Sequence, residues 1–141
     1  MTISSRYAVA IHILSLLEIN KEERITSDFI AGSVNTNPVV IRRIIGMLGK
    51  AGLVITNPGV AGAQLARPID RITLLDVYRA VQSDPEEELF ALHDNPNPQC
   101  PVGRNIQGAL EGTFAQAQKA MEEELRKVTL QQIVHQVSQE S

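Results

Sequence analysis

Two adjacent arginines, Arg42 and Arg43, are the residues of this sequence best suited to bind a polyanion. They follow the pair Asn37-Pro38, which is typical of a helix start, because asparagine caps free N–H groups and a first-position proline loses no hydrogen bond. A guanidinium group binds guanine or phosphate, and a valine contacts a thymine methyl. The stretch therefore predicts a helix that reads DNA. A solvated helix face is the alternative for both arginines.

The charge of the chain is unevenly distributed. The 141 residues have a net charge of −3, but residues 1–72 hold eight bases and five acids, and residues 73–141 hold five bases and eleven acids. The first part is therefore +3 and the second −6, as expected when only one part of a protein meets phosphate. No apolar run approaches the roughly 20 residues of a membrane span, and one cysteine cannot form an internal disulfide. These features predict a globular, cytoplasmic protein without membrane contact.

The single thiol, Cys100, could carry a different chemistry. It precedes Pro101 at the predicted start of a long helix, where the positive helix end lowers the pKa of a thiol. This position predicts a redox- or electrophile-sensitive thiol, with a small inert residue as the alternative. His93 lies seven residues earlier and suggests a thiol enzyme, but no third group that would orient the histidine is evident. The histidines lack metal-ligand spacing, so no metal site is expected.

Two short helices joined by a tight turn hold the arginines in place. Thr26 or Ser27 can cap the first helix, Asn35 can adopt the left-handed turn conformation, and Gly52 ends the second helix. This is the helix-turn-helix pattern. The buried face of the second helix is predicted to consist of Ile41, Ile44, Ile45 and Leu48.

Signals for a hairpin follow. The stretch "LVIT" (53–56) is strand-like, "NPGVAG" (57–62) is a turn cluster, and "AQLA" (63–66) can return as a second strand. Helix, helix and hairpin are the order of a winged-helix module, whose second helix enters the major groove. A further apolar stripe predicts a helix ahead of the motif, capped by Ser4 or Ser5. The predicted fold class is mainly α, with a winged helix-turn-helix domain in residues 1–82 and a two-stranded wing.

The C-terminal part contains the longest helical pattern, from Pro101 to Val128. Its apolar residues recur at spacings of three and four, which is a heptad-like seam that predicts pairing with a second copy. Residues 101–141 are thus interpreted as a dimerisation helix with a C-terminal helix capped by Thr129. The acidic, proline-rich residues 83–100 are interpreted as an effector or linker segment. The predicted seam comprises Ile106, Leu110, Phe114, Ala117, Met121 and Leu125.

In their order and spacing these motifs resemble the Rrf-type family of winged-helix transcription regulators, which includes the iron–sulfur-cluster regulator and the nitric-oxide-sensing repressor. The resemblance covers nearly the whole chain. It implies a homodimeric DNA-binding repressor that is joined through the long helix and binds a palindromic double-stranded operator. The stretches that carry it are "ISSRYAVAIHILSLL", "TSDFIAGSVNTNPVVIRRIIGMLGKAGLV", "LARPIDRITLLDVYRAV" and "LRKVTLQQI".

Two stretches depart from the family pattern. Members that hold an iron–sulfur cluster use three cysteines before the long helix, whereas this chain has only Cys100 there. The stretch "PQCPVGRNI" is similar to the cluster-free branch, so no cofactor is expected. The family's wing often has an arginine before its glycines, where this chain has Asn57-Pro58. The N–H groups of Gly59 and Gly62 could still contact phosphate, with an ordinary hairpin turn as the alternative.

The residues thus predict a DNA-binding regulator with no catalytic residue and an unknown effector. The net acidity and the reduced wing also fit a winged-helix module that binds protein instead of DNA. Serines at the first helix are predicted to cap it or to contact phosphate. The predicted DNA contacts are Ser4, Arg6, Thr26, Asn37, Pro38, Val39, Val40, Arg42, Arg43, Gly59, Gly62 and Arg67.

Overall fold

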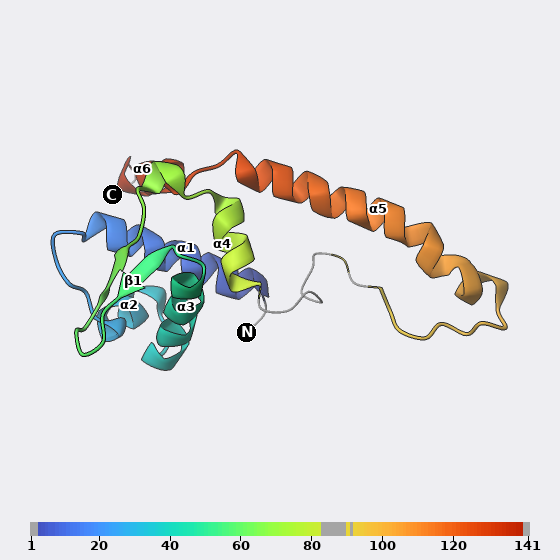
Figure 1. Cartoon of the computed structure of the whole chain (residues 1–141), viewed down its shortest axis with the longest axis horizontal. Helices are drawn as coiled ribbons and strands as arrows, with labels where there is room; N and C mark the ends of the chain where they lie inside the picture. Colours follow the sequence, from blue (N-terminus) through green and yellow to red (C-terminus); the bar gives the residue numbers. More distant parts are fainter. Residues whose placement is uncertain (1–2, 83–89, 91, 140–141) are drawn as a thin grey trace.

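The computed structural model describes residues 3–82, 90 and 92–139 (Figure 1). Helices dominate it, and one two-stranded sheet pairs Val54 with Leu65 and Thr56 with Ala63 in antiparallel register. The predicted mainly α fold with a two-stranded wing is confirmed. The elements are α1 (Ile3–Ile19), α2 (Ser27–Val34), α3 (Pro38–Lys50), β1 (Val54–Thr56), β2 (Ala63–Leu65), η1 (Ile69–Arg71), α4 (Leu74–Val81), α5 (Pro101–Arg126) and α6 (Leu130–Gln139).

Side-chain caps mark the starts of α2, α3 and α4. The side chain of Thr73 accepts the N–H of Asp76, and the Asp76 carboxylate accepts the N–H of Thr73, which is the reciprocal capping box of α4. The start of α1 differs from the prediction. Because α1 already begins at Ile3, Ser4 and Ser5 lie inside its first turn and have helical backbone, whereas a cap residue must be non-helical. The predicted capping by these serines is wrong.

The hydrophobic core lies where α1 crosses the helix-turn-helix and α4. Ile13 and Leu14 of α1 and Ile41 and Leu48 of α3 are fully buried in it. Leu130, at the start of α6, is also fully buried in this core, although it follows α5 in the sequence. The folded N-terminal module therefore includes a residue from the far end of the chain.

A short backbone bridge anchors α6 to this module. The N–H of Leu130 donates to the carbonyl of Ile72 at 2.8 Å, and the N–H of Leu74 donates to the carbonyl of Val128 at 2.9 Å. The helix then packs against α1 and η1, at the upper edge of the module in Figure 1. In its contacts α6 thus belongs to the α1 core, even though the sequence places it next to α5.

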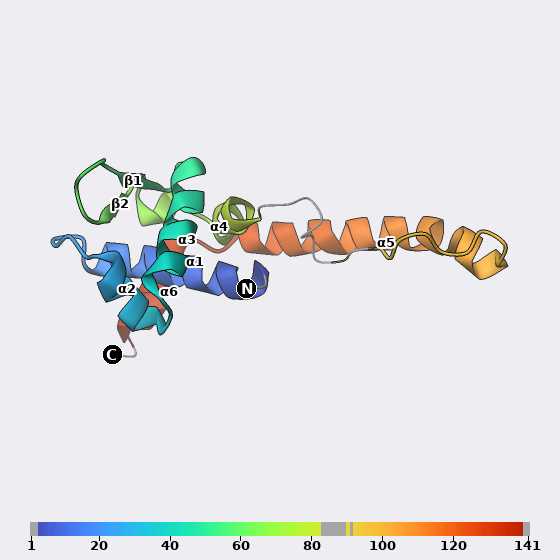
Figure 2. The same cartoon turned by 90° about the horizontal axis from the view of Figure 1, so that it is seen from below.

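Helix α5 extends away from the rest of the molecule. Figures 1 and 2, which differ by 90°, both show it as a rod that leaves the module beside α4 and projects to one side. None of its 26 residues is buried. In the part of the chain that the structure describes, no helix is both long and apolar enough to cross a membrane.

Candidate nucleic-acid interface

Helix α3 presents one face to the core and the opposite face to solvent. The Asn37 Oδ1 atom accepts the N–H of Val40 at 3.1 Å, and Pro38 occupies the first helical position, as predicted. Ile41, Ile44 and Leu48 are buried, whereas Arg42 and Arg43 are exposed and Val39 is 57% exposed. The two guanidinium groups and an uncovered valine therefore lie together in the first turns of α3.

The turn before α3 brings α2 alongside this surface. Thr26 caps α2 by accepting the N–H of Phe29 at 3.1 Å, and Asn35 takes the left-handed conformation with φ of 67°. Both features were predicted. Because its oxygen accepts the cap bond, the exposed Thr26 hydroxyl keeps its proton available for an outside acceptor. The geometry is that of a helix-turn-helix with α3 as the exposed second helix.

The wing lies beside α3, and both reach the lower edge of the module in Figure 1. Gly59 and Gly62 have φ of 76° and 93°, which glycine adopts at little cost. A side chain at Gly59 would point into open space, but a Cβ at Gly62 would lie 3.0 Å from the carbonyl oxygen of Ile25. Gly62 therefore serves a close backbone contact, whereas Gly59 is uncovered at the wing tip.

A groove of about 750 Å³ separates α3 from the wing. Its walls are mainly apolar and come from the C-terminal half of α3, from β1 and from the wing loop. Arg42 and Lys50 are the two basic residues along it. Lys50 was not predicted as a site residue, because nothing in the local sequence distinguishes it from any other lysine in the last turn of a helix.

The remaining predicted contact residues have different surroundings. The Arg67 Nη1 atom donates to the carbonyl oxygen of Arg71 at 3.1 Å and lies 3.6 Å from the Asp76 carboxylate, so Arg67 connects the end of the wing to the start of α4. Arg6 is partly buried within α1. The side chain of Ser4 lies outside the described part of the structure. The roles of these three residues at DNA stay predictions.

A further arginine, Arg24, contacts the wing loop, and the sequence gave no reason to select it. It lies in the loop between α1 and α2, and its Nη1 atom is 3.4 Å from the carbonyl oxygen of Ala61. These residues are 37 positions apart, and no local pattern connects them. The fold thus adds a cation to a wing loop that has no charged residue of its own.

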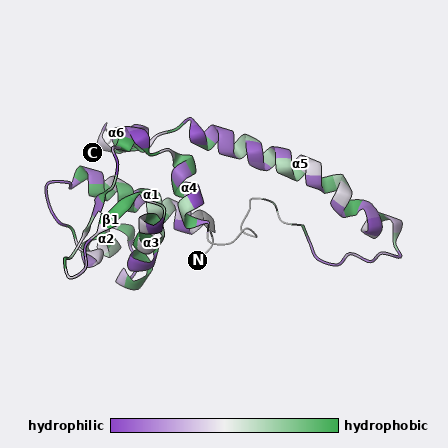
Figure 3. Cartoon of the chain, in the orientation of Figure 1, coloured by the Kyte–Doolittle hydropathy of each residue, from purple (hydrophilic) through white to green (hydrophobic). Residues whose placement is uncertain are grey.

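Helix α5 has an apolar stripe that is only partly covered in the single chain. In Figure 3 the rod is mostly hydrophilic with interspersed apolar turns, while α1, α3 and β1 are richer in apolar residues. Phe114 stacks on Phe90 with ring centroids 5.0 Å apart. Every seam residue is partly exposed in the single chain, namely Ile106, Leu110, Phe114, Ala117, Met121 and Leu125.

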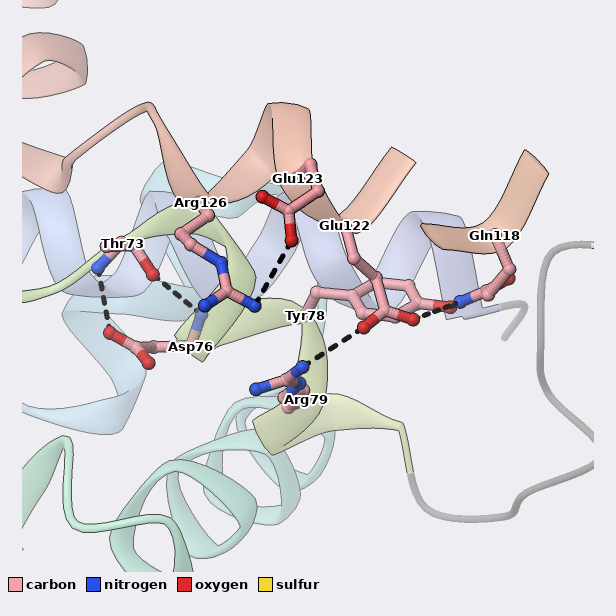
Figure 4. Close-up of polar contacts among 8 residues, drawn as sticks. All are labelled: Thr73, Asp76, Tyr78, Arg79, Gln118, Glu122, Glu123 and Arg126. Atoms are coloured by element: carbon pink, nitrogen blue, oxygen red, sulfur yellow. Dashed lines mark hydrogen bonds and ion pairs between the residues drawn. The ribbon is translucent and has the colours of Figure 1, made fainter. Parts of the chain in front are cut away.

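Polar contacts fix the base of α5 against α4 (Figure 4). The Glu122 carboxylate accepts hydrogen bonds from Arg79 at 3.0 Å and from Gln118 at 3.1 Å. Gln118 also donates to the Tyr78 hydroxyl at 3.3 Å. The hydrogen bond from Gln118 and, to a smaller extent, that from Arg79 lower the pKa of Glu122, because both stabilise the ionised carboxylate. The direction of the rod relative to the module is thus held by charge-assisted hydrogen bonds.

Cys100 occupies the N-cap position of α5, as predicted, and is exposed. The backbone N–H groups of Gly103 and Val102 lower the pKa of its thiol, although the sulfur makes no full capping hydrogen bond. Gly103 allows the preceding loop to fold over the helix end, since a Cβ there would clash with the Asn97 carbonyl oxygen. Among the described residues no hydrogen bond joins Cys100 to His93, whose carbonyl oxygen accepts from Gln107.

Core, turn, exposed α3 and wing together define a winged helix-turn-helix protein of the transcription-regulator class. The sequence matches over residues 3–136 the family Rrf2, described as "Iron-dependent Transcriptional regulator". The chain belongs to the Rrf2 family, in agreement with the resemblance seen in its motifs.

Several relatives are similar along nearly their whole length. The "Putative HTH-type transcriptional regulator YwnA" of Bacillus subtilis (strain 168) is 54% identical over 133 residues, which are 94% of this chain and 97% of the relative. A crystal structure of "a putative DNA binding protein" is 48% identical, covers 91% of this chain and 97% of its own, and has a TM-score of 0.73. CymR of B. subtilis, "the Global Cysteine Regulator", shares the fold at 20% identity and a TM-score of 0.66, covering 96% and 97% of the two chains.

The iron named in the family description has no matching donor set here. Iron–sulfur clusters are held by several cysteine thiolates, and the whole sequence contains one cysteine. Within residues 3–82, 90 and 92–139, no three His, Cys, Asp or Glu side chains are grouped closely enough to hold a metal ion. The residues of a single chain therefore do not fit a thiolate-held cluster.

Proposed function

We propose that this protein is a homodimeric regulator that binds double-stranded DNA in a sequence-specific manner and represses transcription. One observation carries the proposal: Arg42, Arg43 and Val39 lie together on the solvent face of α3, in the N-terminal turns that follow the Asn37-Pro38 cap. Arginine reads guanine or binds phosphate, and valine contacts a thymine methyl. A helix that only filled the core would gain little from these exposed residues.

Different parts of the surface have different roles in this proposal. Arg42, Arg43 and Val39 enter the major groove with the first turns of α3, and the side chains of Asn37 and Thr26 lie at the flanking phosphates. Val40 and Pro38 position that turn. The wing glycines and the side chains near the start of α1 contact the backbone of the duplex. Because phosphate contacts carry no sequence information, specificity rests on the three α3 side chains.

The dimer forms through α5. A partly exposed apolar seam over 26 residues is costly for an isolated chain, since burying it against a second copy removes apolar surface from water. Two copies related by a two-fold axis present two α3 helices. The operator is then palindromic, with half-sites about 34–36 Å apart or a multiple of that distance.

A signal acts through residues 83–100, which connect α4 to the N-terminal end of α5, the end of the rod that lies far from the module in Figure 1. Residues 83–89 and 91 of this segment lie outside the described residues. Cys100 is the candidate for a thiol-based signal, since it is exposed and its thiol pKa is lowered. Any change at this segment is transmitted by altering the angle between α5 and α4, where Glu122 joins the two helices.

Membership of a regulator family supports this function over the two alternatives. A module that binds only protein is supported by the net acidity and the reduced wing alone, whereas the family and its similar relative are described as transcriptional regulators. A thiol enzyme would need Cys100 and His93 in contact, and among the described residues no hydrogen bond joins them. We infer that the chain performs no catalysis.

The test selects bound duplexes from a random 40-bp library at near-physiological salt and measures their affinity by fluorescence anisotropy. Enrichment of a palindromic site, with affinity that falls log-linearly with salt, supports the proposal. Arg43→Ala should weaken binding to the selected site by about 1–3 kcal/mol and relax its base preference. Arg71→Ala, which removes the same charge from η1, should have little effect. Failure to enrich any duplex would refute the proposal.

A further inference from the structure

The wing loop of this protein carries no cation of its own. Residues 57–62, "NPGVAG", contain no charged side chain. The loop is nevertheless exposed throughout its tip, and Val60 is 45% exposed. A wing of this composition can offer backbone N–H groups to phosphate, but it cannot release a counterion on its own.

The fold brings a cation from elsewhere in the chain to this loop. Arg24 lies before α2, and its Nη1 atom is 3.4 Å from the Ala61 carbonyl oxygen. The two segments are packed closely, because a Cβ at Gly62 would lie 3.0 Å from the Ile25 carbonyl oxygen and 3.7 Å from the Arg24 Cβ. Arg24 is therefore held at the wing tip by the packing of both backbones, and its position follows that of the wing.

The guanidinium group of Arg24 is available to an outside anion. The side chain is exposed, and it forms no ion pair with any described residue, although Glu22 and Glu23 precede it. A guanidinium has five N–H donors and stays charged at every physiological pH. Its bond to Ala61 leaves most of these donors directed to solvent. Arg67 differs, since it has the Arg71 carbonyl oxygen and the Asp76 carboxylate as partners.

We propose that Arg24 is the phosphate-binding residue of the wing and replaces the arginine that the wing loop itself lacks. The inference rests on the proposed DNA binding. The wing tip and α3 reach the same edge of the module, and Figure 2, which views that edge, shows the loop between α1 and α2 next to the wing. A duplex that takes α3 in its major groove meets Arg24 at the backbone beside the wing.

The experiment measures the salt dependence of DNA binding for the full-length protein and its variants. The probe is a fluorescein-labelled 40-bp duplex of mixed sequence, because a phosphate contact also contributes to non-specific binding. Loss of one phosphate contact makes the slope of log Kd against log salt shallower by about 0.9, so loss of Arg24 from both protomers of the proposed dimer should change the slope by roughly 1.8. Arg24→Ala should show this change and bind several-fold more weakly at low salt, and Arg24→Lys should restore the slope. Arg71→Ala, the same charge change on η1 beside α6, should keep the wild-type slope.

Other outcomes would overturn the inference. If Arg24→Ala weakens binding without changing the slope, Arg24 only supports the wing through Ala61. If its slope and affinity both equal those of the wild type, Arg24 does not meet DNA. A loss confined to certain base sequences would assign Arg24 to base reading instead of phosphate binding. If the wild-type protein binds no duplex at all, the proposed function itself fails, which is a distinct result.

Discussion

Replacement of Leu130 by alanine tests whether α6 is an integral part of the N-terminal module. The accessible fraction of Leu130 is 0%, and its side chain packs in the core formed around α1, α3 and α4. The substitution removes three carbon atoms, and about 0.8 kcal/mol per buried methylene gives roughly 2.4 kcal/mol of lost transfer free energy. The cavity that remains raises the expected loss to about 3–5 kcal/mol.

This loss is large relative to the total stability of about 5–15 kcal/mol that is usual for a domain. Urea titration followed by circular dichroism measures it, at one fixed protein concentration because dimer dissociation would otherwise contribute. For a chain of this size we expect the melting temperature to fall by roughly 10 °C. The backbone bridge between Leu130 and Ile72 is unchanged by the substitution, so the effect reports packing.

Val137→Ala is the matched control, because it truncates an apolar residue of the same helix that is 50% exposed. Its cost should stay below about 0.5 kcal/mol. If Leu130→Ala destabilised the module by no more than Val137→Ala does, α6 would not be part of its core. The proposed α1–α6 packing would then be wrong.

Three further predictions concern the seam and two titrating groups. Met121→Glu should convert a dimer into monomers in sedimentation analysis, whereas Lys119→Glu on the exposed face should not, and a dimeric Met121→Glu protein would contradict the seam. Burial, with a smaller contribution from Tyr78, raises the pKa of Tyr7 to about 12 from 10.0. Because the Tyr7 hydroxyl ionises at lower pH in the unfolded chain than in the folded one, the stability that it contributes below pH 10 should be lost between pH 10 and 12. Urea titrations should find this loss in the wild type and not in Tyr7→Phe. Because helix N–H groups lower the pKa of the Cys100 thiol, iodoacetamide should alkylate it at lower pH in the native protein than in urea, and coincident rate–pH curves would disprove this.

Much of the helix-turn-helix could be predicted because its signals are local. Asn37 and Pro38 begin α3, Thr26 caps α2 and Asn35 makes the turn, each through contacts within three or four residues. The apolar period then identified Ile41 as core. The start of α1 differs from the prediction, because α1 already begins at Ile3 and therefore includes Ser4 and Ser5.

The candidate site was predictable only in part. The exposed arginines of α3 follow from the helix period, because their angular distance from the apolar face is set by 3.6 residues per turn. Arg24 and Lys50 could not be selected, since their nearness to the wing depends on how β1 and β2 fold back. Arg67 was expected to be available to phosphate, but the fold gives it the Asp76 carboxylate as a partner.

The sequence by itself determined the order of helices, the turn, the wing and the family, because capping, turn conformation and apolar periodicity act over a few residues. Only the tertiary structure decided that α6 returns to the α1 core through Leu130 and that Arg24 lies at the wing tip beside Ala61. Such contacts join residues dozens of positions apart. They are selected by the shape and packing of the assembled surfaces, which no short stretch of sequence encodes.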